Sequence, residues 1–263
     1  MTDSAANTPG DKYDLALVMP CYNEREVVAK TVADLQEAFA RSAYRLQLVA
    51  VDNGSTDETG DILNRLREQY DNMVVHRVER NQGYGYGVLS GFAHADAPWV
   101  GSIVADGQVD ADDVVKLFAD AMKLSQRKLV KVRRRFRMDG LKRKIVSVIY
   151  NCMTTLMFGG LGSIDINGSP KIIPREYLER MNLQSKDWFL DAEIMIKAKR
   201  LGLGVYEKNI FAQLRPGGRS NVNSSACWEF IVNLLRYRFG RAGRTLAAGE
   251  PSHRVEAPAC HGD

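Results

Sequence analysis

A chain of 263 residues with 45% hydrophobic content is long enough to bury the core of one main α/β domain. Its four cysteines lie far apart without a C-x-x-C pair, which argues against a zinc site or a disulfide framework and favours a reducing, cytoplasmic location. The formal net charge of +4 is modest, the N-terminus lacks the pattern of a signal peptide, and no apolar run is long enough to span a membrane. We therefore expect a chain that does not cross a membrane by itself.

The predicted elements alternate between strands and helices. Short apolar runs at 15–20 and 46–52 lack period-two alternation, which is typical of strands buried on both faces. A helical pattern follows each run, over Glu26–Phe39 and from a capping box at 55–58 through Tyr70. Strands at MVVHRV and WVGSIVA and helices at GYGVLSGFAHA and Ala111–Leu124 come next. This order predicts an α/β fold with a mostly parallel twisted sheet, helices on both faces, and a ligand site at the carboxyl ends of the strands.

Three of these strand ends carry acidic residues. Glu24 follows the first predicted strand, Asp52 ends the second and Asp106 follows the fourth. Each one alone has a structural explanation, because acidic residues after a strand are often turn or helix-cap residues. Three carboxylates at one edge would raise one another's pKa unless a cation or a donor-rich ligand joined them. A nucleotide with a divalent metal would supply both.

Four motifs, taken in order and spacing, resemble a known family. They are PCYNE from Pro20, VDNGSTD from Val51, NQGYG from Asn81 and ADGQ from Ala105. Together they are similar to the family 2 glycosyltransferases with the GT-A fold, over roughly residues 14–240. The second half, with DINGSPK and WFLDAE, is most similar to the polyprenyl- and dolichyl-phosphate sugar synthases. The resemblance implies an inverting transfer of a sugar from a nucleoside diphosphate sugar.

The same resemblance implies a set of nucleotide-binding residues. Asp52 would accept a hydrogen bond from the base, and the loop at Gly83 would pass close to the nucleotide, which suits glycine because it lets the backbone approach a ligand. The structural alternative for this loop is a simple turn before a helix. The full set is Pro20, Tyr22, Glu24, Asp52, Gly83 and Asp106.

The metal site implied by the resemblance is incomplete. The family pattern at the fourth strand end is usually Asp-x-Asp, often continued as Gly-Gln, and Val104 stands where the first Asp is expected. Asp106 and the amide oxygen of Gln108, together with diphosphate oxygens, would then hold Mg²⁺ or Mn²⁺ more weakly than a full site. Asp110 and the acidic residues after it are expected to cap the next helix and form its first turn.

On the acceptor side the resemblance implies catalytic roles for three residues. Asp165 would lie near the acceptor, Lys171 would contact phosphate and Asp191 would lie in the position of a base. A hydroxyl acceptor needs such a base, whereas a phosphate monoester, with a second pKa of about 6, is mostly dianionic near neutral pH. The structural alternative is that Asp191 caps the helix through Leu201 and that Asp165 caps a turn.

A basic run bears on the identity of the acceptor. Arg127–Lys144 contains ten Lys or Arg and one Asp and directly precedes an apolar helical pattern that begins at Ile145. Such a pair suits a lipid phosphate at an anionic leaflet. The alternatives are an exposed basic strand and loop and an ordinary core helix. A second apolar helix, over 228–239, would lie on the membrane or close the domain. The expected acceptor-binding residues are Arg135, Lys142, Arg143 and Arg219.

We therefore predict a disordered N-terminus over 1–13, a GT-A domain over 14–241 and a disordered tail over 242–263. The predicted function is the transfer of a sugar to a polyprenyl phosphate at the inner face of the cell membrane, with room for a membrane-protein partner. The alternatives are a soluble or cell-wall hydroxyl acceptor and, because Val104 departs from the pattern, a nucleotide-binding module with little turnover. A nucleic-acid partner is not expected, since the basic run contains one aromatic residue, Phe136.

Overall fold

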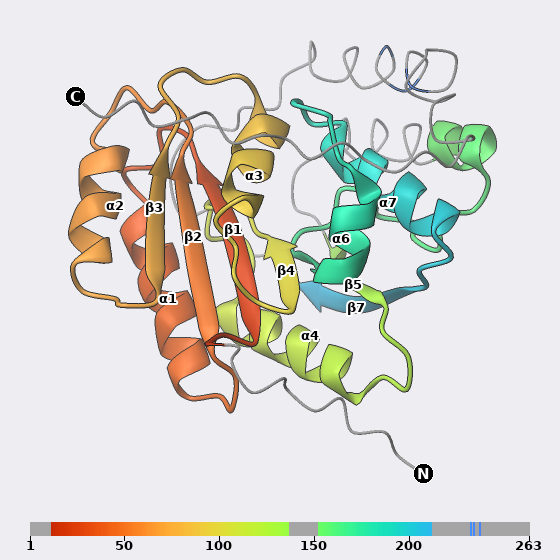
Figure 1. Ribbon diagram of the computed structural model, residues 1–263, viewed down its shortest axis with the longest axis horizontal. Coiled ribbons are helices and arrows are strands. Elements are labelled where there is room, and N and C mark those ends of the chain that lie inside the picture. Colours follow the sequence, from red (N-terminus) through yellow and green to blue (C-terminus); the bar gives the residue numbers. More distant parts are fainter. Residues whose placement is uncertain (1–11, 137–151, 212–231, 233, 235–236, 238–263) are drawn as a thin grey trace.

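A computed structural model of the chain describes residues 12–136, 152–211, 232, 234 and 237 (Figure 1). The predicted disordered tail and all but the last two residues of the predicted disordered N-terminus lie outside this range. Lys142, Arg143 and Arg219 lie outside it too, as does most of the apolar pattern that begins at Ile145. Arg135 lies in a described strand, but its side chain is not described.

The described elements follow the predicted alternation of strands and helices. The strands are β1 Leu15–Cys21, β2 Leu46–Asp52, β3 Met73–Arg77, β4 Trp99–Ser102, β5 Leu129–Phe136, β6 Lys171–Pro174 and β7 Val205–Phe211. The helices are α1 Val28–Ala40, α2 Thr59–Arg67, α3 Tyr84–Phe92, α4 Ala111–Lys123, α6 Arg175–Met181 and α7 Leu190–Arg200, and residues 152–158 are also helical.

These strands form a seven-stranded sheet in the order β3-β2-β1-β4-β6-β5-β7. β1 pairs in parallel with β2 and β4, β2 with β3, and β5 with β7, whereas β6 runs antiparallel to both of its neighbours. The predicted mostly parallel sheet is therefore confirmed. Because β1, β2 and β4 run the same way, their carboxyl ends lie on one edge, where ligands of open α/β sheets bind.

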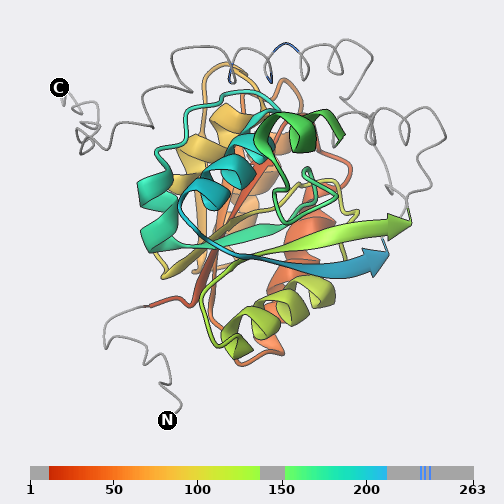
Figure 2. The same cartoon turned by 90° about the vertical axis from the view of Figure 1, so that its right-hand side faces the viewer.

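Helices cover both faces of the sheet, as Figure 2 shows with α4 on one side and α6 and α7 on the other. On the first face, Leu17 and Met19 of β1 pack with apolar residues of α1, α2 and α4, such as the fully buried Phe118. On the opposite face, Val18 of β1 packs beneath α3. Strands β1 and β2 are thus buried on both sides, which explains their continuous apolar sequence.

A second apolar cluster forms around α7, in which every residue from Leu190 to Ala198 is buried. Leu234 and Tyr237, from the predicted second apolar helix, pack into this cluster. These two side chains therefore help to close the domain. Within the described ranges, no helix is both long enough and apolar enough to span a membrane.

The structure corrects two local predictions and confirms a third. Ser55 does not cap α2, which begins at Thr59, because the Ser55 hydroxyl accepts a hydrogen bond from the Asn23 N–H (3.2 Å) instead. β4 ends at Ser102, three residues earlier than predicted, so the ADGQ motif lies in a loop. Asp110 caps α4 as expected, since its carboxylate accepts a hydrogen bond from Asp112 N–H at 2.9 Å.

Candidate active site

The ends of β1 and β2 bring two of the predicted acidic residues together around Cys21. Burial raises the pKa of the Cys21 thiol, and the negative charges of Glu24 and Asp52 raise it further. The backbone N–H of Glu24 donates to the Thr59 hydroxyl (2.9 Å), which holds the loop after β1 against α2. Pro20, Tyr22 and Glu24 are half-buried along this edge. The predicted nucleotide-binding residues of the first two strands thus lie next to one another.

Asp52 has one carboxylate oxygen without a hydrogen bond. Its Oδ1 accepts a hydrogen bond from Ser55 N–H at 2.9 Å, whereas its Oδ2 is buried and has no hydrogen-bond partner among the described residues. The nearest cation is Arg77, whose Nε lies 3.7 Å from Oδ2 and whose side chain is 66% exposed. The described residues therefore supply no hydrogen-bond donor to this oxygen.

The loop after β4 holds the candidate metal residues. Gly107 adopts a positive φ of 67°, and the Gln108 N–H donates to Oδ1 of Asp106 at 3.1 Å. The Thr31 hydroxyl donates to the Ala105 carbonyl (3.2 Å), which ties the loop to α1. No group of three or more His, Cys, Asp or Glu side chains in the described part of the chain is arranged to hold a metal ion. Asp106 and Gln108 supply hard oxygen donors, so a Mg²⁺ or Mn²⁺ ion here would need further oxygens from a diphosphate or water.

The glycine-rich loop packs against a second loop, 185–187. Gly83 has a φ of 111°, and a Cβ on it would lie 2.4 Å from the Lys186 carbonyl oxygen. A Cβ on Gly85 would lie 2.3 Å from the Ser185 carbonyl oxygen. Loop packing therefore already requires both glycines. The loop is also a turn before a helix, since Gly83 directly precedes α3. The approach of Gly83 to a nucleotide stays a prediction.

Tyr84 lies at the end of β4, between the predicted nucleotide-binding and acceptor-side residues. Its ring stacks on Trp188 with centroids 4.5 Å apart and planes 7° from parallel. Burial raises the pKa of its hydroxyl well above the usual value, and the charges of Asp191 and Asp106 raise it further, while a hydrogen bond with Ser102 lowers it. The hydrogen bond with Ser102 places the phenol at the end of β4, beside the strand that carries Lys171. Neither aromatic side chain was predicted from the sequence to have a role.

Asp165 is paired with Arg134 of β5. Nη2 and Nε of Arg134 donate to its two carboxylate oxygens at 2.8 and 3.0 Å, and the Arg134 N–H donates at 3.1 Å. Burial alone would raise the pKa of Asp165, but the hydrogen bonds and charge of Arg134, with the charge of Lys131, hold it well below its usual range. The carboxylate thus stays ionised and paired, and does not act as the cap that its position suggested.

Lys171 and Asp191 form a buried ion pair. Nζ of Lys171 lies 2.5 Å from Oδ1 of Asp191, and the two side chains are 0% and 7% exposed. Burial lowers the pKa of Lys171 to about 8, although the charge of Asp191 opposes this effect. The cap interpretation of Asp191 is wrong, since Phe189 occupies the N-cap of α7 and the Asp191 carboxylate faces Lys171.

The antiparallel strand β6 positions Lys171 between two neighbouring strands. Lys171 lies opposite Ser102 of β4 on one side and Lys131 of β5 on the other. Lys131 is fully buried, and its Nζ donates to the Asp165 carbonyl at 2.5 Å and pairs with Glu207 of β7 at 3.0 Å. Within the described part of the basic run, Lys131 and Arg134 are therefore held in buried or half-buried ion pairs rather than on an exposed charged surface.

Four of the residues that shape the candidate site were not predicted from the sequence. Arg134 and Lys131 were hidden in the basic run, where composition does not separate buried from exposed charges. Trp188 and Tyr84 lie in quoted motifs, but their stacking depends on two loops that are far apart in the chain.

Known proteins resemble this chain in sequence and in fold. The family model for "Glycosyl transferase family 2" matches residues 16–180. An uncharacterized glycosyltransferase of Mycobacterium tuberculosis is 29% identical over 222 residues, which cover 84% of this chain and 94% of that protein.

Relatives with assigned activities are similarly distant. A dolichyl-phosphate beta-glucosyltransferase of Trichomonas vaginalis is 27% identical over 208 residues, covering 73% of this chain and 64% of that one. An undecaprenyl-phosphate 4-deoxy-4-formamido-L-arabinose transferase of Proteus mirabilis is 30% identical over 146 residues, or 55% of this chain and 44% of that one.

Solved structures share the fold at low identity. Glucosyl-3-phosphoglycerate synthase of Mycobacterium tuberculosis, in complex with Mn²⁺ and UDP, has a TM-score of 0.67 and 18% identity over 87% of this chain and 81% of that one. Mannosyl-3-phosphoglycerate synthase of Rubrobacter xylanophilus has a TM-score of 0.70 and 16% identity over 92% of this chain and 79% of that one. These likenesses confirm the GT-A fold expected from the motifs.

Proposed function

Since the chain belongs to glycosyl transferase family 2, we propose that it transfers a sugar, with inversion, from a nucleoside diphosphate sugar to a polyprenyl phosphate. The observation that carries this proposal is the pairing of both acceptor-side carboxylates with cations. Asp165 is held by Arg134 and Asp191 by Lys171. Neither carboxylate is an unpaired base.

The pairing favours an acceptor that needs no deprotonation. A hydroxyl must lose its proton during attack, whereas a phosphate monoester with a second pKa of about 6 is already mostly dianionic near neutral pH. The Arg134 guanidinium, whose Nε and Nη2 already donate to Asp165, would attract such a dianion through its positive charge. Relatives that act on dolichyl and undecaprenyl phosphate support the lipid form of this acceptor.

On the donor side, the orphan Oδ2 of Asp52 suits an N–H of the base once Arg77 moves aside. Asp106 and Gln108 would hold Mg²⁺ or Mn²⁺ through their oxygens, together with the diphosphate. When bound, such an ion stabilises the negative charge that develops on the leaving nucleoside diphosphate. The structural neighbours that bind UDP with Mn²⁺ or Mg²⁺ support this assignment.

Acceptor chemistry is tested by transfer of radiolabelled sugar to polyprenyl phosphate, to free polyprenol and to phosphoglyceric acid. The third compound represents soluble acceptors, because the glucosyl-3-phosphoglycerate synthase structures hold it. We expect labelled product with polyprenyl phosphate alone. Product with polyprenol or phosphoglyceric acid, and none with polyprenyl phosphate, would contradict the proposal and restore Asp191 as the preferred base.

Two variants separate phosphate recognition from general charge loss. Arg134→Gln should abolish transfer, because it removes the guanidinium at the acceptor side. Arg127→Gln is the matched control: Arg127 lies before the amino end of β5 and pairs with Glu176 at 3.6 Å, where both side chains are exposed. Flotation with liposomes that contain acidic lipid, at low and high salt, tests peripheral attachment through the basic run, which should weaken with salt.

A further inference from the structure

We propose that Tyr84 and Trp188 form an aromatic wall on which the transferred sugar packs, so that this pair determines which sugar the protein accepts. The inference rests on the proposed function, because it assumes a nucleoside diphosphate sugar as donor. It adds a sugar-recognition surface to the donor and acceptor residues described above.

The position of the pair is the first argument. A sugar in transfer must lie between the diphosphate that leaves it and the acceptor that attacks it. The Tyr84 hydroxyl makes a hydrogen bond with Ser102, the last residue of β4, after which the chain runs on to Asp106. Ser102 also lies opposite Lys171, which pairs with Asp191. The Tyr84 side chain therefore lies between the proposed donor and acceptor residues, where the sugar must lie.

The chemistry of the pair is the second argument. Two rings 4.5 Å apart and 7° from parallel cover one face of each other and leave their outer faces and edges as apolar surface, and both side chains are half-buried, so part of that surface is open. Ligand sites are commonly lined by aromatic side chains with a few well-placed polar groups. Carbon–hydrogen faces of a sugar ring pack on such a surface, while carboxylates beside it accept hydrogen bonds from sugar hydroxyls.

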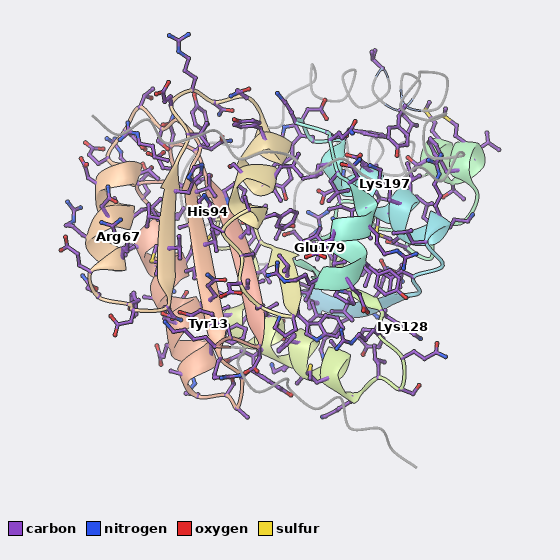
Figure 3. The ribbon with its side chains drawn as sticks, in the orientation of Figure 1. Tyr13, Arg67, His94, Lys128, Glu179 and Lys197 are labelled. Atoms are coloured by element: carbon purple, nitrogen blue, oxygen red, sulfur yellow. The ribbon has the colours of Figure 1, made fainter. Side chains whose placement is uncertain are left out.

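The pair is also held rigidly, as a recognition surface requires. Glu193 of α7 is 1% exposed, and its Oε2 accepts hydrogen bonds from the N–H groups of Gln184 (3.1 Å) and Ser185 (2.8 Å). Lys197, labelled on α7 in Figure 3, pairs with Glu193 at 2.6 Å and donates to the Asn182 carbonyl at 2.6 Å. This buried clamp fixes the loop that carries Trp188.

The same loop is fixed to the glycine-rich segment from the other side. The Tyr86 N–H donates to the Lys186 carbonyl at 2.9 Å, and Gly83 and Gly85 have no Cβ to obstruct the approach. The stack of Tyr84 on Trp188 is thus set by contacts on both loops. Glu193 and Lys197 act as positioning residues for the wall, since they reach it through the loop.

Binding measurements test the wall without requiring an acceptor. Calorimetry compares UDP with UDP-glucose, and GDP with GDP-mannose, for the wild type and for Trp188→Leu and Trp188→Phe. Tyr44→Leu is the control, because Tyr44 also makes an aromatic contact, with Phe118 at 5.0 Å, but precedes β2 at the opposite edge of the sheet.

We expect Trp188→Leu to weaken binding of the nucleotide sugar about tenfold while leaving the nucleoside diphosphate nearly unaffected, a size that matches one lost aromatic contact. Trp188→Phe should recover part of the loss, and Tyr44→Leu should show none. Equal weakening of both ligands, or no weakening of either, would overturn the inference and leave the proposed function intact. A wild-type chain that binds none of the four ligands, nor CDP or dTDP, would refute the proposed function and the wall together.

Discussion

Replacing Asp191 with Asn should destabilise the fold strongly, because it leaves the Lys171 ammonium buried without a counter-ion. The two side chains are 0% and 7% exposed and lie 2.5 Å apart, so water cannot take the place of the lost carboxylate. Breaking a buried ion pair from one side costs about 3–5 kcal/mol. Asp191→Asn should therefore lower the free energy of unfolding by an amount in this range at pH 7.

A half-buried pair of the same length, which water can reach, provides the control. Lys208 and Asp120 also lie 2.5 Å apart, but their side chains are 27% and 26% exposed. Asp120→Asn should cost about 1 kcal/mol or less, since water screens a pair near the surface. The double variant Lys171→Met/Asp191→Leu should recover most of the stability lost in Asp191→Asn, because an apolar pair needs no compensating charge.

Urea unfolding at pH 7, followed by circular dichroism, measures all four proteins. If Asp191→Asn loses no more stability than Asp120→Asn, the prediction is wrong, because the Lys171–Asp191 pair would then not be buried. The prediction is also wrong if the double variant is as unstable as Asp191→Asn, since the loss of stability would then come from packing rather than from an unpaired charge.

The lowered pKa of Lys171 should also make the free energy of unfolding depend on pH. Burial lowers this pKa to about 8 from the usual 10.5, so between these two values the unfolded chain binds more protons at this site than the folded chain. Stability therefore rises with pH through this window, by about 3 kcal/mol in total for a shift of this size. The difference in unfolding free energy between the wild type and Lys171→Met should rise accordingly from pH 8 to 10.5, and a flat difference would contradict the assignment.

Three further predictions concern the other pairs and loops. The low pKa of Asp165 stabilises the wild type, and Arg134→Gln should remove this stabilisation. The free energies of unfolding of the two proteins, measured in urea, should therefore become equal as the pH falls below about 4. Val104→Asp should tighten Mn²⁺-dependent binding of a nucleoside diphosphate or leave it unchanged. Calorimetry with and without EDTA measures this binding, and weaker binding by the variant would contradict the prediction. Gly85→Ala should cost about 1–3 kcal/mol, because its Cβ would meet the Ser185 carbonyl oxygen at 2.3 Å, whereas Gly204→Ala, with its nearest atom at 3.5 Å, should be nearly neutral in thermal unfolding.

Patterns within the sequence predict the layered fold and the sheet edge that carries the candidate site. The apolar runs at β1 and β2 have no alternation because both faces are covered, and their predicted bounds match the structure within one residue. Parallel strands force their carboxyl ends onto one edge, so Glu24, Asp52 and Asp106 could be placed there from sequence order alone. Local chemistry also sufficed for the cap of α4, because Asp110 lies two residues from the N–H that it binds.

Tertiary structure alone decided which charges meet. Asp191 and Lys171 are twenty positions apart, and Asp165 and Arg134 thirty-one, so neither pairing has a local signal. The first pairing depends on β6, which runs antiparallel to its neighbours and places Lys171 between β4 and β5.

The stack of Tyr84 on Trp188 arises in the same way, from two loops that pack together only when the sheet and α7 are in place. Periodicity and turn chemistry act over a few residues, whereas the pKa values and pairings of a site are set by side chains that the chain brings together from a distance. The physical reason is that burial removes water from these groups, and each then depends on the partner that the fold supplies.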